Sequence, residues 1–238
     1  MVLNRQSDIN ELLAESFELL QQIEEGYAGA KNNEEIIQIA KPKVKSCLEH
    51  LRSCLDYIAT DLSGITNSSK TPRDIHFPYG KDRKIFIKSL NRNLPDLSSN
   101  YQEIIENIQP HTSGDKWLLH LCKTVNFNKH TELQQQDRVN SDKSTTTVGN
   151  LVRMEGGGNL TIGNIYINGE HKNPKGPLVV TKDKPIKDIV DETGLDIPIE
   201  RKYEWVRFVL KGTALDVREL LSVSHSKITN LVSEIYSA

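Results

Sequence analysis

The organisation of the chain is decided by residues 213–238, TALDVRELLSVSHSKITNLVSEIYSA. Apolar residues recur there three and four positions apart, which predicts an amphipathic helix. The expected buried stripe consists of Leu220, Leu221, Ile228, Leu231, Val232 and Ile235. Thr213 is the expected N-cap, with Asp216 three residues later. One helix of this kind cannot bury its stripe by itself, so it needs an apolar partner elsewhere in the chain.

The N-terminal part of the chain supplies that partner. Apolar residues recur there at helical spacing over several segments, which predicts a bundle of helices. Expected helices lie at 9–23, 44–62, 85–90, 99–108 and after Thr112 or Ser113. The first of them is expected to end around Gly26 to Gly29, because glycine is typical of a helix C-terminus.

The helical spacing of apolar residues ends after residue 133. Residues 134–143 are polar, and the runs 145–154 and 160–168 are rich in strand-forming residues. Between the two runs lies Gly156-Gly157-Gly158, which we interpret as a hairpin turn that needs positive φ. It opens no helix, and this argues against a phosphate-binding loop. Further short strands are expected at 178–181 and 203–210.

These patterns predict an α+β fold. The N-terminal helices and the C-terminal helix form a helical bundle, and a small antiparallel β-sheet is inserted between them. The expected boundaries are 1–137 for the helical bundle, 138–212 for the β-rich insertion, and 213–238 for a C-terminal helix that packs back on the bundle.

The composition argues against a protein that wraps duplex nucleic acid, a membrane protein and a disulfide-rich protein. The chain of 238 residues has 30 basic and 32 acidic residues, so it has no overall basic field with which to wrap duplex nucleic acid. It has no run of about 20 apolar residues, so we expect no membrane association. Its three cysteines, Cys47, Cys54 and Cys122, form no CxxC pair, which argues against a disulfide framework. We therefore expect a cytoplasmic protein.

Five polar residues are candidates for a binding site. Arg52 and Asp56 lie four apart on the second helix, where they form either a solvated ion pair or part of a cleft between helices. Lys129, with Asn128 and Glu132, continues the apolar face of the last N-terminal helix, whereas Asn126 and His130 lie four apart on another side of it. We expect the two groups to face each other, with Lys129 paired to Asp56.

Signatures of common catalytic and metal sites are missing from the sequence. It contains no GxxxxGK[ST], HExxH or GxSxG motif. The spacing of His111, His120 and His130 does not place them on one helical face, and no carboxylate accompanies them at ligand spacing. We therefore expect neither a metal nor a cofactor.

Four short motifs in order resemble those of a widespread group of bacterial proteins that have no assigned activity. In that group the motifs read LRSxLDY, FP, QP and NxxKH. The corresponding segments here are LRSCLDY at 51–57, HFP at 76–78, IQP at 108–110 and NFNKH at 126–130. Asn128 and Thr131 stand where the group favours Asp and Arg.

The helical part also resembles HEPN domains, which are small bundles found in ribonucleases of toxin–antitoxin and phage-defence systems. Their active sites contain an Arg and a His separated by four to six residues, and Arg218 and His225 fit that spacing. The resemblance implies that His225 acts on a 2′-hydroxyl proton and Arg218 stabilises charge on the phosphate, within a homodimer.

Two functions from different classes follow. The first is a non-catalytic binding or regulatory module that recognises a protein partner or small ligand in a bacterial or phage conflict system. The second is a HEPN-like, metal-independent endoribonuclease that acts on RNA through Arg218 and His225. We prefer the first, because no constellation of residues in the sequence has the composition of a complete catalytic site.

Overall fold

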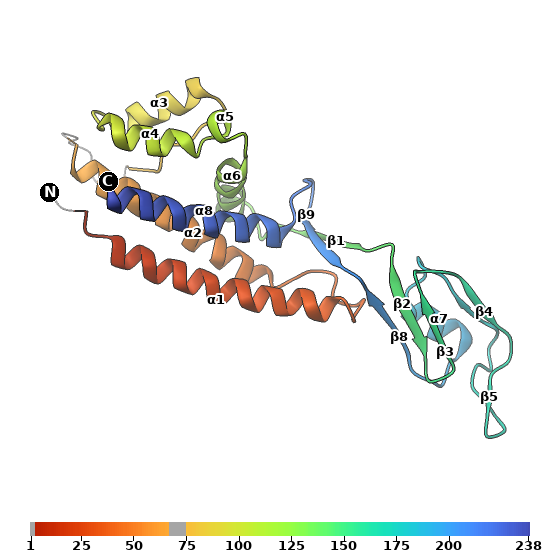
Figure 1. The fold of residues 1–238 in the computed structure, drawn as a ribbon. Coiled ribbons are helices and arrows are strands. Elements are labelled where there is room, and N and C mark those ends of the chain that lie inside the picture. The colour runs from red at the N-terminus through yellow and green to blue at the C-terminus, as the bar shows by residue number, and fades with distance from the viewer. Residues whose placement is uncertain (1–2, 67–74) are drawn as a thin grey trace. The chain divides into compact units, whose positions relative to one another are not determined.

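The computed structural model describes residues 3–66 and 75–238. It contains α-helices and small antiparallel sheets, which confirms the expected α+β fold class. The chain divides into two compact units, coloured along the sequence in Figure 1. The helical unit comprises the residues up to Glu24, Ala40–Gln135 and Leu210–Ala238. The β unit comprises Gln136–Val209 and also Glu25–Ile39, a segment that the sequence pattern had not assigned to it.

The helical unit is built from helices at both ends of the chain. Its helices are α1 (Gln6–Ala30, whose last turns belong to the β unit), α2 (Lys41–Gly64), α3 (Arg83–Asn93), α4 (Ser99–Asn107), α5 (Pro110–Ser113), α6 (Trp117–His130) and α8 (Val217–Ser237). Helix α8 packs against α2, α4 and α6, and α2 packs against α6. The C-terminal helix is therefore an integral part of the bundle (Figure 1).

The apolar stripe of α8 lies where its spacing predicts. All six of its Leu, Ile and Val residues listed above are buried, with at most 6% of any one exposed. The N-cap differs from the prediction: Asp216 takes this place, and its side chain accepts a hydrogen bond of 3.1 Å from the backbone N–H of Glu219. A carboxylate at this position satisfies an otherwise unpaired amide of the first turn. Thr213 instead donates its hydroxyl to the carbonyl oxygen of Leu210.

Helix α1 continues to Ala30, past the glycines at which we expected it to end. A Cβ atom at Gly26 would lie 2.5 Å from Cδ1 of Ile39, so this glycine allows a close approach of the following segment. Its role is in packing within the β unit rather than in helix termination.

The β unit consists of short strands and one helix. The strands are β1 (Gln136–Asn140), β2 (Ser144–Val148), β3 (Val152–Glu155), β4 (Leu160–Ile162), β5 (Tyr166–Ile167), β6 (Glu170–His171), β7 (Leu178–Val180), β8 (Ile199–Tyr203) and β9 (Val206–Leu210), and the helix is α7 (Ile186–Thr193). Strands β3, β2 and β8 form one sheet in that order, and the other sheets are the pairs β1–β9, β4–β7 and β5–β6. A small apolar core lies among β2, β7 and α7, and its buried members are Val148, Ile165, Leu178, Val180, Ile189 and Leu195.

The pairing of the strands corrects two sequence predictions. The run 145–154 is itself a hairpin, with Thr146 of β2 opposite Met154 of β3, while β4 pairs with β7. Gly156 and Gly157 have the expected positive φ angles of 83° and 74°, but they do not join two paired strands. The turn of this hairpin contains Gly149-Asn150, a pair typical of hairpin turns, so the sequence carried the signal and our prediction did not use it.

Two further elements differ from the sequence interpretation. The strand expected at 203–210 is two strands, β8 and β9, which end and begin on either side of Glu204 and Trp205. Helix α7 was not predicted, since its eight residues are too few to display a clear helical period.

Candidate functional site

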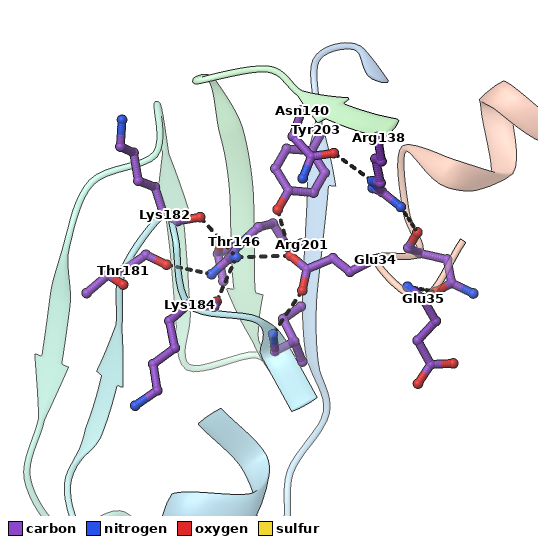
Figure 2. A network of polar contacts seen from close by, with 12 residues as sticks. Glu34, Glu35, Arg138, Asn140, Thr146, Thr181, Lys182, Lys184, Arg201 and Tyr203 are labelled. Atoms are coloured by element: carbon purple, nitrogen blue, oxygen red, sulfur yellow. Dashed lines mark hydrogen bonds and ion pairs between the residues drawn. The ribbon is translucent and has the colours of Figure 1, made fainter. Parts of the chain in front are cut away.

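Arg201 on β8 is the centre of a buried polar network in the β unit (Figure 2). The residue is 2% exposed, and its Nη1 lies 2.9 Å from Oε1 of Glu34. It also donates to the hydroxyl of Thr146 at 3.2 Å and to the carbonyl oxygens of Thr181 at 2.9 Å and Lys184 at 3.0 Å. Arg201 thereby ties the segment before α7 to the sheet and to Glu34.

Glu34 uses both carboxylate oxygens. Its Oε1 also accepts a 2.7 Å hydrogen bond from the hydroxyl of Tyr203, whose pKa is raised by burial. Its Oε2 accepts a 2.9 Å bond from the backbone N–H of Ile186, the first residue of α7. Figure 2 shows Glu34 between Arg201 and Tyr203. One side chain thus fixes the segment after α1 against both β8 and the start of α7.

Arg138 on β1 binds the backbone of the segment after α1 that contains Glu34. Its guanidinium group donates to the carbonyl oxygens of Ala30 at 2.8 Å, Asn33 at 2.6 Å and Ile36 at 2.9 Å. It also lies 5.6 Å from the centre of the Tyr203 ring. Ala30 is the last residue of α1, so Arg138 places a positive charge at the carbonyl end of that helix, where it is stabilising.

A polar pocket of about 340 Å³ lies on one side of this network. Most of its charged groups already have partners: Glu34 pairs with Arg201, Lys182 Nζ lies 3.3 Å from Asp142, and Arg138 is bound by carbonyl groups. The exposed Asp183 is the exception among the described residues that line this pocket. We therefore regard it as part of the scaffold of the β unit.

A second cavity, which we call the groove, has a volume of about 490 Å³. Its walls are residues 32–35, the segment from Pro185 into α7, and the first residues of β8. Four apolar residues line it: Pro185, Ile186, Val190 and Ile199. Glu34 and Arg201 also line it, so the buried network holds its walls together.

Four exposed carboxylates surround the groove, and we call them the acidic rim: Glu35, Asp188, Asp191 and Glu200. Within residues 3–66 and 75–238, none of the four makes an ion pair. The basic residues that line the groove are Lys187 and Arg201. Glu34 neutralises the charge of Arg201, so Lys187 alone opposes the four carboxylates of the acidic rim. The groove therefore has a partly apolar lining and an excess of negative charge.

Arg52 and Asp56 form a separate cluster in the helical unit. Arg52 Nη2 lies 2.9 Å from Asp56 Oδ1, and its Nη1 donates to Cys122 Sγ of α6 at 2.7 Å. Arg52 is 9% exposed, so the interpretation as a solvated surface pair is wrong. Asp56 also accepts a 2.9 Å bond from the backbone N–H of Phe77. Burial raises the pKa of Cys122 to about 11, so this thiol is neutral and the cluster has no thiolate nucleophile.

The remaining predicted binding residues are only partly brought together with that pair. Tyr79 links them, because its ring lies 5.5 Å from the Arg52 guanidinium carbon and its hydroxyl forms a hydrogen bond with Asn126. Burial raises the pKa of Tyr79, and the bond with Asn126 opposes part of this rise. Lys129 is exposed and makes no ion pair with any described residue, so the expected pairing with Asp56 is not observed. The side chain of His130 lies outside the described residues.

Arg218 and His225 both contact α1. Nε2 of His225 lies 3.1 Å from the carbonyl oxygen of Leu13, and its ring centre is 5.8 Å from that of Phe17. Nη1 of Arg218 lies 3.5 Å from Oε2 of Glu24. A carbonyl oxygen only accepts hydrogen bonds, so the contact with Leu13 requires a proton on Nε2 of His225. This nitrogen therefore acts as a hydrogen-bond donor and does not serve as a base.

Sequence reasoning missed the network and the groove. One signal was present, because Ile199, Arg201 and Tyr203 alternate along β8 and thus share a face of the strand. An arginine between two apolar residues on one face of a strand indicates a buried charge that needs a partner. Nothing in the sequence near Glu34 identifies it as that partner.

Residues 3–66 and 75–238 contain no group of three or more His, Cys, Asp or Glu side chains placed to hold a metal ion. No helix within these ranges is both long enough and apolar enough to cross a membrane. Comparison of the chain with known protein families, curated proteins and solved structures finds no match.

Proposed function

We propose that the chain is a non-catalytic binding module and that the groove of the β unit is its binding site. The observation that carries this proposal is the acidic rim around a partly apolar cavity of about 490 Å³, a volume typical of ligand sites. Uncompensated charge beside an apolar surface favours a ligand that has both a cationic and an apolar part.

The chemistry of the lining supports binding rather than catalysis. Among the described residues that line the groove there is no histidine, cysteine, serine or threonine. Nucleophilic and general acid–base mechanisms in enzymes use mostly these groups or a carboxylate with a perturbed pKa. Burial raises the pKa values of the other two cysteines, Cys47 and Cys54, to about 12, so both remain neutral thiols.

The ribonuclease alternative predicts a different result from a simple assay. We expect tRNA and total RNA to stay intact when incubated with the wild-type protein without added metal, because His225 Nε2 is engaged by Leu13. Gel analysis of the RNA checks this. Cleavage that is lost in His225→Ala but kept in His120→Ala would favour the ribonuclease and contradict the binding module.

Blocking the groove with a large side chain tests whether it is the binding site. We expect n-butylammonium to bind the wild-type protein weakly and saturably, whereas n-butyrate should not bind at the acidic rim. Val190→Trp places a large side chain in the groove and should abolish this binding. Val139→Trp on β1, which is exposed and outside the groove, is the matched control and should bind normally. Backbone amide shifts in nuclear magnetic resonance spectra measure the binding, and equal binding by both variants would contradict the proposal.

A further inference from the structure

We infer that the ligand of the groove is an extended segment of a partner protein in which cationic and apolar side chains alternate. This inference rests on the function proposed above and specifies the ligand of that site. Its first support is the position of the acidic rim, whose carboxylates come from three segments: Glu35 after α1, Asp188 and Asp191 on α7, and Glu200 on β8.

The distribution of charge over three walls favours a chain over a small cation. One ammonium group can approach the carboxylates of one wall at a time. In an extended peptide, alternate side chains point to the same side about 6.6 Å apart, since each residue advances the chain about 3.3 Å. The intervening side chains point to the opposite side, so such a peptide can place its apolar side chains against Ile186, Val190 and Ile199. Its lysine or arginine side chains are long enough to bend back to the carboxylates at the rim.

The acidic rim is only partly explained by the needs of the fold. Asp188 lies in the first turn of α7, where a carboxylate stabilises the helix. Asp191 lies near the opposite end of the same helix, where a negative charge is unfavourable and the last turn has no basic residue. Lys175 Nζ donates to the backbone carbonyl oxygen of Asp191 at 3.2 Å, and neither Lys175 nor Lys187 forms an ion pair with the Asp191 carboxylate. Glu35 and Glu200 are exposed and make no ion pair with described residues. Cations from a partner would remove this repulsion.

The same charges argue against other macromolecules. The phosphate backbone of a nucleic acid would be repelled by four carboxylates faced by one lysine. A purely apolar segment would leave those carboxylates without partners and would remove part of their hydration. A basic and apolar segment satisfies both parts of the groove.

The experiment uses three fluorescently labelled pentapeptides and fluorescence anisotropy on the full chain. The sequences are Lys-Leu-Lys-Leu-Lys, Lys-Ser-Lys-Ser-Lys and Glu-Leu-Glu-Leu-Glu, all acetylated and amidated. We expect the first to bind most tightly, the second more weakly, and the third not at all. Affinity for the first should fall as NaCl rises from 50 to 300 mM, because salt screens exposed charges.

A charge-matched pair of variants locates the contact. The triple variant Asp188→Asn, Asp191→Asn and Glu200→Gln should bind Lys-Leu-Lys-Leu-Lys about 10-fold more weakly, since each exposed charge pair contributes roughly a factor of two. The control Asp137→Asn, Glu155→Gln and Glu192→Gln changes the net charge equally at exposed positions of the β unit outside the groove and should bind like wild type.

Two results would overturn the inference: binding of the acidic peptide as tight as that of the basic one, or equal affinity of the two triple variants. Binding of n-butylammonium to the groove tests the proposed function separately. If this probe still binds at the groove while the basic peptide does not, the inference fails and the binding site stands. If neither binds, both fail.

Discussion

A chain that ends at Gly212 is expected to lose the cooperative folding of the helical unit. Helix α8 contributes seven buried apolar residues to this unit. Burial of each Leu, Ile or Val side chain contributes about 1.5–3 kcal/mol. Their sum reaches the whole stability of a typical domain, which is about 5–15 kcal/mol. Circular dichroism during heating should show a loss of the cooperative helical transition.

Point variants separate this effect from the truncation itself. Leu221→Ala, at a fully buried position, should lower the free energy of unfolding by about 2–5 kcal/mol. Ser222→Ala, at the exposed neighbouring position, should change it by about 0.5 kcal/mol or less. If the truncated chain melted cooperatively near the full-length temperature, α8 would not belong to the core of the bundle.

Arg201→Met should destabilise the β unit by about 3–5 kcal/mol, the usual cost of removing one partner of a buried ion pair. The substitution removes the cationic partner of the Glu34 carboxylate and the donor to the carbonyl oxygens of Thr181 and Lys184. Hydrogen exchange of the amides in β2 and β8 should accelerate, while exchange in α2 should be little changed.

A surface arginine of the same unit provides the control for Arg201. Arg153 pairs with Glu155 on β3, and both side chains are about two-thirds exposed. Arg153→Met should therefore cost about 1 kcal/mol or less. Equal protection of β2 and β8 in the two variants would mean that the network around Arg201 does not hold the unit together.

The helical unit could be predicted from sequence because its information is local. The stripe from Leu220 to Ile235 repeats at the helical period over four turns, and all its members are buried. The spacing of Arg52 and Asp56 likewise predicts their contact, since residues four apart on a helix are neighbours. Their burial was not predictable, because it depends on Cys122 of α6, which lies 70 residues further along the chain.

The groove could not be predicted because no part of it is local. Its walls come from segments near residues 33, 188 and 200, and each carboxylate by itself looks like an ordinary solvated side chain. The contact between Glu34 and Arg201 joins residues 167 positions apart. A periodic pattern carries no information about such pairs, so only the folded β unit reveals that these charges converge.

The most direct test of the account is the amide shift map of isotope-labelled protein titrated with n-butylammonium. The map identifies the residues whose backbone amide shifts change when the cation binds, even when binding is weak. We predict that the largest shifts fall on residues 32–35, 186–191 and 199–201, and that Val190→Trp removes them. Largest shifts at Arg52 and Asp56, or around Arg218 and His225, with none at the groove, would contradict the central claim that this chain binds its ligand through the β unit.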